Sequence, residues 1–491
     1  MDVSADININ RREVQRQIQG CSDILFRPMK IGRDRSVSCF LIYVEVAASN
    51  MMLEDSVIGR FLNHMRTVED GKITGILAND ALGISDTKLL DTMEESMAAM
   101  LAGNVVLFVD GFAHGIKIGS KGYPGAGVMK AESEKVLRGS KEAFSESVKV
   151  NTALIRKRIR DTRMKVLEQP VGTYSNTMTA LVYMEGVAYQ PILERIQEKL
   201  KSFEVDGVLD SGVIEQLTED TWYSPFPQYQ TTERPDRAAM AVLEGRAVLV
   251  SDNSPEALIL PTTWSSLFQT SDDYYRHFAI VTFLRIVRYL AAFLAAALPG
   301  IYVAVINYHP QLLPANLIFS LAEARAGVPF PGIVEVLLLE WSFELLREAG
   351  LRMPGPIGNT IGIVGGLIIG QAAVSANIVS PVVVVVVALT ALGSFCVPNE
   401  EVSEALRLYK YVILLLCGFF GILGVFLGGF LLAVHLGSLK SFGVSYLTPF
   451  CRVGERTGLA ERDDLVKGPA RRQSKRPVFA ARKNRTRLKM R

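Results

Sequence analysis

Cysteine and histidine are scarce in this sequence, and neither forms a pattern that suggests chemistry. The 491 residues include five cysteines and five histidines, all scattered. No CxxC pair, H-E-x-x-H motif or G-x-S-x-G motif occurs. The glycine-rich stretch at 115–122, GIKIGSKG, has the wrong spacing for a phosphate-binding loop and fits a β-hairpin better. We therefore expect no disulfide framework, no metal site, no cofactor and no enzymatic activity.

The first residues, MDVSADININRREVQRQ, lack the apolar stretch of a cleavable signal peptide, so the N-terminal half is expected to stay cytoplasmic. The net charge of +3 conceals an uneven distribution. Residues 467–491 contain 11 of the 53 basic residues and none of the 50 acidic ones, so the rest of the chain is mildly acidic. We interpret 451–491 as a basic, disordered tail that either marks topology or binds anionic lipid.

The N-terminal half contains an internal repeat. Strand-like segments align Tyr43 with Tyr183, and helix–glycine–strand segments align Gly103 with Gly245 at nearly the same offset. In each copy an apolar helix ends at a glycine and is followed by a strand, a turn and a second strand. We therefore predict two related α/β subdomains, at 1–150 and 151–270.

The C-terminal third has long uncharged runs that predict an all-α, polytopic membrane domain over 271–450. These runs cover 289–306, 353–399 and 411–434. The second is too long for one span and suits two spans joined by a turn at 375–377. Four spans are predicted, at 286–306, 357–374, 378–397 and 409–434. Basic residues at both ends place both termini in the cytoplasm, which four crossings satisfy.

Between the first two spans, 329–352 is apolar at helical spacing yet carries several carboxylates. The candidate pore or vestibule residues are Glu335, Glu340, Glu344 and Glu348. Because a charge at the bilayer centre costs about 2.5–3.5 kcal/mol, these side chains must face water, protein or the interface. Arg347 and Arg352 are expected to neutralise the glutamates three and four residues before them. The segment is either an amphipathic surface helix or a re-entrant, cation-attracting vestibule.

The span at 357–374 carries a glycine every fourth residue, which leaves one face bare. The candidate packing or gating residues are Gly358, Gly362, Gly366, Gly370 and Gln371. Such a face allows close helix approach, a pore or a moving interface. A looser series, Gly418, Gly421, Gly424 and Gly428, occurs in the last predicted span.

Four strings carry a resemblance to a known family. They are ALIRKRIRD at 153–161, SPFPQYQTTERPDR at 224–237, SDDYYRHF at 271–278, and the long string from VPFPGIVEVLLLEW to QAAVSANIVS at 328–380. The chain resembles the A subunit of GerA-type spore germinant receptors from about residue 20 to 450. It departs at Arg138-Gly139-Ser140, where the family has R-G-P, and the tail beyond Arg452 resembles nothing in the family.

The resemblance implies a multi-pass protein of the spore inner membrane, with both termini in the spore core. It implies a homo-oligomer, a pentamer, that passes monovalent cations when nutrient is sensed. The implied partners are the B and C receptor subunits and the lipid bilayer, with no nucleic acid. A two-part cytoplasmic domain is also a family feature.

Two hypotheses follow for function. In the first, the chain is a gated cation-conducting subunit of a nutrient receptor. In the second, it is a non-conducting scaffold that assembles the receptor. A related protein encoded with the stage V sporulation A proteins shares this layout, but the strings SPFPQ, EAGLRMP and GGLIIGQAAV fit the receptor branch better.

Overall fold

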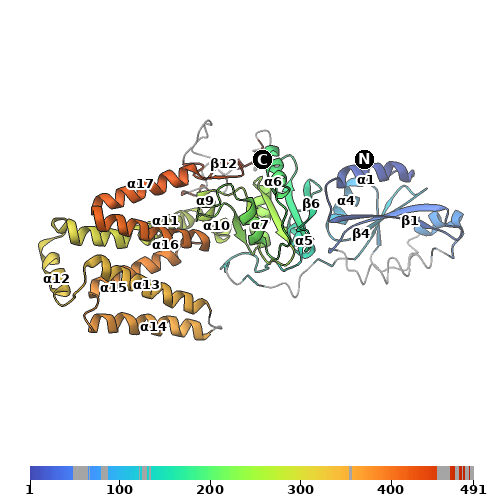
Figure 1. The fold of residues 1–491 in the computed structure, drawn as a ribbon. Coiled ribbons are helices and arrows are strands. Elements are labelled where there is room, and N and C mark those ends of the chain that lie inside the picture. Colours follow the sequence, from blue (N-terminus) through green and yellow to red (C-terminus); the bar gives the residue numbers. More distant parts are fainter. Residues whose placement is uncertain are drawn as a thin grey trace.

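The computed structural model describes residues 1–47, 65, 67–78, 87–120, 122–123, 130–131, 134–352, 356–450 and, in the C-terminal tail, 465–469, 471, 475–477, 479–481 and 486. Figure 1 shows an α/β region followed by a bundle of helices that extends away from it. The predicted order, α/β first and helical afterwards, is confirmed.

The first subdomain is one antiparallel sheet with helices packed against it. Its strands lie in the order β1-β2-β4-β5-β3. The elements are α1 (Ile7–Ile18), β1 (Ile24–Ile31), β2 (Val37–Val44), α3 (Ile73–Ala78), β3 (Thr87–Leu90), α4 (Met93–Leu101), β4 (Val105–Val109) and β5 (Gly115–Ile118). The inner strands β2 and β4 are apolar and buried, as a sheet covered on both faces requires.

The second subdomain repeats this topology. Its strands lie in the order β6-β7-β9-β10-β8, the same path as in the first sheet. The elements are α5 (Val148–Arg158), β6 (Met164–Val171), β7 (Thr177–Met184), α6 (Gln190–Leu200), α7 (Ser211–Thr218), β8 (Gln230–Thr232), α8 (Pro235–Leu243), β9 (Ala247–Ser251) and β10 (Ala257–Leu260).

The offsets found in the sequence are also the offsets between the two sheets. Strand β6 begins as far after β1 as Tyr183 lies after Tyr43, and β9 begins as far after β4 as Gly245 lies after Gly103. Gly103 and Gly245 both have positive φ, +94° and +93°. The predicted repeat therefore corresponds to two copies of one fold.

The two sheets are joined along the outer edge of β6. The backbone of Val166 exchanges hydrogen bonds with Gly20 and Ser22, in a short parallel bridge. Beside it, the guanidinium of Arg156, fully buried, donates two hydrogen bonds to Asp23, at 2.7 and 2.8 Å. Phe144 and Val148 belong to the core of the second subdomain, so the predicted boundary at residue 150 falls inside its first helix, α5.

Short helices α9 (Trp264–Leu267) and α10 (Asp272–Tyr275) connect the second sheet to the bundle. The bundle helices are α11 (Phe278–Tyr308), α12 (Ala315–Arg325), α13 (Gly332–Leu351), α14 (Pro356–Ser375), α15 (Pro381–Phe395), α16 (Glu400–Phe420) and α17 (Ile422–Ser438). A hairpin of β11 (Lys440–Ser441) and β12 (Val444–Ser445) then returns to the second subdomain, where Phe442 enters its core. Helices α14 and α15 follow the predicted segments closely, and Asn377 with positive φ makes the predicted turn between them.

The span predicted at 409–434, which contains the uncharged run at 411–434, is not one helix, contrary to our prediction. The chain reverses at Gly421, whose φ of +60° and ψ of −137° end α16, and α17 runs back along it. The reversal brings the two helices into close contact: a side chain at Gly424 would meet the backbone of Leu416, and one at Gly428 would meet Ile413. The run is therefore a helical hairpin that requires glycine at its contact points.

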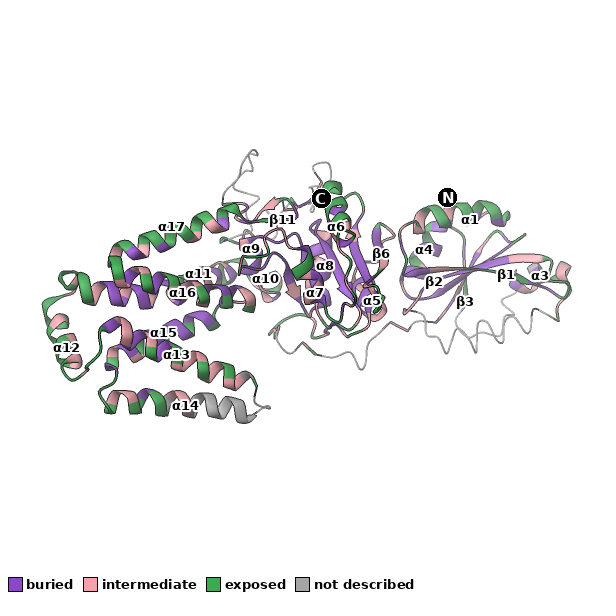
Figure 2. Ribbon diagram, viewed as in Figure 1, coloured by how far each residue is buried: buried purple, intermediate pink, exposed green. Residues whose placement is uncertain are grey.

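Among the described residues, one helix, α11, is long and apolar enough to cross a membrane, and α15 and α17 are shorter apolar helices. Helix α11 is also the centre of the bundle, since it packs against α13, α15, α16 and α17. Figure 2 shows many exposed residues along the outside of these helices. They include large apolar side chains such as Phe293, Leu389, Phe426 and Phe430.

The tail is not disordered throughout, contrary to our prediction. Several of its described residues pack against the second subdomain, where Phe479 and Ala480 are buried at 6% and 2% exposure. Lys467, also buried, donates through its backbone N–H to Thr282 at the start of α11. Nothing in the apolar pattern of the tail revealed this, because a single aromatic residue among basic ones carries no periodic signal.

Candidate functional site

The site predicted from the sequence lies on α13, which is a member of the bundle. Val336 and Leu339 are buried among Tyr302 of α11, Val383 of α15 and Leu414 of α16. The helix begins directly after Pro331. Because one face of α13 is enclosed by three other helices, it does not lie alone on a surface, as one of our alternatives held.

The four candidate carboxylates are each paired with a cation. Glu335 is fully buried and accepts hydrogen bonds from Arg325 of α12, at 3.2 Å, and from the backbone N–H of Ser380, at 2.9 Å. This carboxylate joins the start of α13 to the end of α12 and the start of α15. A buried carboxylate with two charged or polar donors is a structural tie between helices.

Glu340 forms the most enclosed of these pairs. Its Oε2 accepts a hydrogen bond from the ammonium of Lys410 on α16 at 2.5 Å, and the two side chains are 1% and 3% exposed. Lys410 also lies over the ring of Tyr411, 5.0 Å from its centroid. Removing both charges from water is costly, so the mutual attraction must offset that cost within the bundle.

Glu344 and Glu348 continue along the same face of α13 toward its exposed end. Glu344 accepts from Arg407 of α16 at 2.7 Å, and Glu348 accepts from Arg352 at 2.5 Å. The side chains of Glu344 and Glu348 are 28% and 59% exposed, so burial decreases along this face. We call Glu340, Glu344, Arg407 and Lys410 the α13–α16 charge cluster.

The structure corrects one predicted pairing and confirms another. Arg352 pairs with Glu348 as expected for residues four apart. Arg347, by contrast, lies over the ring of Phe395 at 5.2 Å, and the partner of Glu344 is Arg407. Sequence reasoning missed Arg325, Arg407 and Lys410. The signal that could have revealed two of them is that buried carboxylates require cations. Arg407 and Lys410 are suitable cations, since they lie one helical turn apart immediately before the uncharged run.

The glycine stripe of α14 is only partly among the described side chains. Gly358 and Gly362 lie outside them. A side chain at Gly366 would meet nothing within 4 Å, one at Gly370 would make ordinary contact with Val384 at 3.6 Å, and Gln371 is exposed. Gly370 is thus buried against α15 of its own chain, whereas Gly366 makes no such contact with the described residues.

The charge cluster is connected to the α/β region through α16. Glu401, in the first turn of α16, acts electrostatically on Glu219, which follows α7. Burial, and then the charge of Glu401, raises the pKa of Glu219 to about 7. Burial, and then the charges of Glu219 and Glu256, raises the pKa of Glu215 to about 7. This junction therefore favours protonated carboxyl groups.

The stability of this junction should fall as the pH rises from about 4 to about 7. The pKa values of Glu215 and Glu219 are about 7 in the folded chain and about 4.3 when unfolded, so the folded chain holds more protons between these values. Their contribution is complete below the unfolded pKa and is lost as the pH passes the folded pKa. The thermal midpoint should fall across this range, and the double variant Glu215→Gln, Glu219→Gln should flatten the fall. An equal pH dependence in the double variant would contradict this assignment.

Comparison with known proteins matches almost the whole chain to one family. The model of the Bacillus/Clostridium GerA spore germination protein family matches residues 12–479. The uncharacterized membrane protein YfkQ of Bacillus subtilis is 38% identical over 98% of this chain and 93% of its own length. Spore germination protein KA of the same organism is 33% identical over 99% of this chain and 88% of its own. Spore germination protein GerLA of Bacillus cereus is 34% identical over 87% and 86%.

Among solved structures, the N-terminal domain of the A subunit of the Bacillus megaterium spore germinant receptor GerK3 covers 54% of this chain and 98% of its own. It is 26% identical, with a TM-score of 0.43.

The fold and the site define a class of protein in which a duplicated α/β region leads into an apolar helical bundle tied together by buried ion pairs. Within that class, this chain belongs to the Bacillus/Clostridium GerA spore germination protein family. The match includes part of the tail, up to residue 479, where the sequence alone suggested no resemblance.

Proposed function

We propose that the chain is the A-type membrane subunit of a nutrient receptor that triggers spore germination, and that it conducts monovalent cations. The observation that carries the proposal is the family match over residues 12–479, with relatives named spore germination proteins that align along most of their length. No catalytic role is included. The proposed location is the spore inner membrane.

The arrangement of the bundle supports several membrane crossings. Helices α11 and α13 to α17 run alternately away from the α/β region and back toward it, so that both the α/β region and the tail lie at the same end (Figure 1). Six crossings would keep both termini in the spore core, as four were expected to do. The exposed apolar side chains on the outside of α11, α15 and α17 suit contact with lipid.

The proposed assembly is a homo-oligomer, a pentamer, acting with B and C subunits. Support comes from α14, where a Cβ at Gly366 would meet none of the described residues within 4 Å. A bare helix face in a membrane allows the close approach of a helix from another chain. The oligomer would place α14 of each copy against a neighbour or along the ion path.

The scaffold hypothesis is tested by the two partly exposed glutamates of α13. Glu344→Gln and Glu348→Gln together should reduce potassium release from nutrient-treated spores several-fold, because cations lose attractive charge near their path. The buried Glu340 is left intact, since its loss would disturb folding. Glu94→Gln, an exposed residue of α4, is the matched control. Normal potassium release by an assembled double variant would favour the scaffold, or the stage V sporulation A-type relative.

A further inference from the structure

The two subdomains differ in how one groove is filled. In the first, the groove lies between the turn after β2 and the turn after α4. Residues Gly122 and Tyr123, which follow β5, occupy it. The N–H of Gly122 donates to Ala47 at 2.7 Å, and the hydroxyl of Tyr123 donates to the carbonyl of Leu101 at 2.8 Å. A side chain at Gly103 would meet the ring of Tyr123 at 2.9 Å.

In the second subdomain, the C-terminal tail makes the corresponding three contacts. The N–H of Ala481 donates to Val187 at 2.7 Å, and Arg476 donates through Nε to the carbonyl of Leu243 at 2.8 Å. A side chain at Gly245 would meet the Cα of Ala480 at 2.8 Å.

The groove residues themselves are equivalent in the repeat. Under the offsets that relate the two sheets, the counterparts of Ala47, Leu101 and Gly103 are Val187, Leu243 and Gly245. The same groove is therefore filled locally in one copy and from the other end of the chain in the second.

The reason lies in the path of the chain after β10. By the offset that relates Gly103 to Gly245, the counterpart of Gly122 is Trp264, so the segment beginning there should fill the second groove. Trp264 instead begins α9 and donates its N–H to Tyr446, because the chain here leads into the bundle. The groove is thereby left for another occupant.

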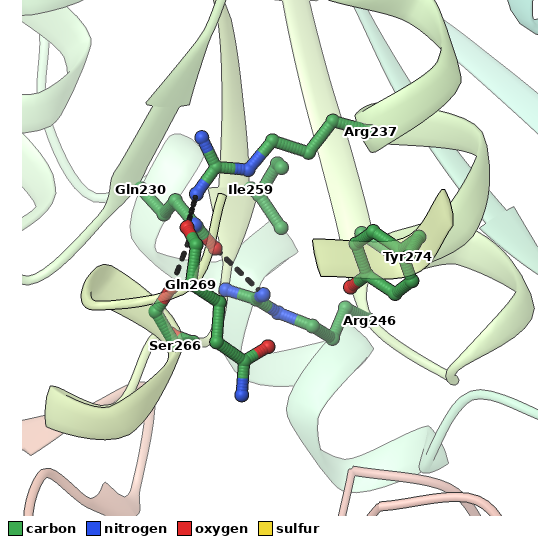
Figure 3. A pocket seen from close by; sticks show the side chains of 8 residues that line it. Gln230, Arg237, Arg246, Ile259, Ser266, Gln269 and Tyr274 are labelled. Atoms are coloured by element: carbon green, nitrogen blue, oxygen red, sulfur yellow. Dashed lines mark hydrogen bonds between the residues drawn. The ribbon is translucent and has the colours of Figure 1, made fainter. Parts of the chain in front are cut away.

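The seated tail segment also covers a buried arginine. The guanidinium of Arg246 donates a hydrogen bond to the side-chain oxygen of Gln230, beside a cavity of about 10 Å³ (Figure 3). The ring of Phe479 lies 5.3 Å from the guanidinium carbon. An aromatic face attracts a guanidinium most strongly where water is excluded. Phe479 is therefore the anchor of the segment, and Ala188 and Ala480 form a β-bridge beside it.

We propose that this groove in the second subdomain, lined by Val187, Leu243, Gly245 and Arg246, is a docking site for a short peptide segment, and that its occupant is the tail of the same chain, through residues 475–477 and 479–481. A cavity of about 420 Å³, bordered by Val187, Leu243 and Arg476, lies beside the segment. Nearer the bundle, Lys467 of the tail contacts both Asp273 and Thr282, where α11 leaves the α/β region. We call the tail a clasp, because it contacts both the second subdomain and the start of α11.

The clasp can be tested by competition in the detergent-solubilised chain. A labelled peptide with the sequence of residues 471–486 should bind a chain truncated after Gly468. It should bind the full chain at least tenfold more weakly, because a tethered tail competes at an effective concentration on the order of millimolar. The control peptide carries Phe479→Asp and Ala480→Lys, which keeps the net charge. Equal binding of the two peptides, equal binding to the two chains, or no binding would overturn the proposal.

A second measurement needs no truncation. In a full chain that also carries Cys396→Ser and Cys451→Ser, the pair Ala188→Cys and Ala480→Cys should form a disulfide within one chain, because the two residues face each other across the β-bridge. Ala480→Cys with Leu209→Cys, an exposed position on a different loop, is the control and should stay reduced. A disulfide between copies would show that a neighbour's tail occupies the groove, and no disulfide would show that the groove is empty. Either result would overturn the intramolecular clasp.

Discussion

Replacing Lys410 with methionine should destabilise the folded chain by about 3–5 kcal/mol, because Glu340 then remains buried without its cation. The two side chains are 3% and 1% exposed, and the second oxygen of Glu340 has no hydrogen-bond partner among the described residues. Glu344, itself a carboxylate, lies 3.7 Å from Lys410 and offers no replacement charge. The expected measurement is a large downward shift of the thermal midpoint in detergent, accompanied by a reduced receptor level in spores.

Two further variants separate lost charge from lost packing. The double variant Lys410→Met, Glu340→Leu should recover most of the stability, since an apolar pair of similar volume replaces a buried ion pair at little cost. Arg352→Met removes the cation from the exposed Glu348 and should cost no more than about 0.5 kcal/mol. If Lys410→Met were as stable as Arg352→Met, the buried pair would not hold α13 to α16.

The repeat and most bundle helices were visible in the sequence because they leave periodic or compositional signals. The offsets between the two copies survive as strand positions, and proline at 381 with asparagine at 377 fixes the turn between α14 and α15. The reversal at Gly421 was missed, because an uncharged run has no hydropathy minimum at which to divide it. The trace that it left was the glycine series Gly418, Gly421, Gly424 and Gly428, which we assigned to one helix face.

The partners of the α13 carboxylates were missed for a different reason. Lys410 is 70 residues from Glu340, and Arg325 reaches Glu335 from a separate helix. Sequence spacing reveals partners three or four residues away, such as Arg352 for Glu348, but long-range pairing depends on which helices become neighbours. The docking of the tail was missed for the same reason, since Arg476 and the carbonyl that it binds are 233 residues apart along the chain.

Gly366→Leu should leave the isolated chain folded yet reduce potassium release from nutrient-treated spores at least tenfold. A Cβ at this position would meet none of the described residues within 4 Å, and leucine is a better helix former than glycine by up to about 1 kcal/mol. Any loss must therefore arise where α14 meets a neighbouring copy or the ion path. The measurement pairs the thermal midpoint of the purified chain with potassium release from spores.

Gly424→Ala is the matched opposite. Its Cβ would collide with the backbone of Leu416, so the α16–α17 hairpin must open, at a cost of about 1–3 kcal/mol in a single chain. The two substitutions thus distinguish two uses of a bare helix face. A substitution at a contact within the chain lowers the thermal midpoint of that chain. A substitution at a contact between copies lowers only assembly or ion flux. If Gly366→Leu left assembly and flux unchanged, α14 would face lipid at this point, and the ion path would have to be sought elsewhere in the bundle.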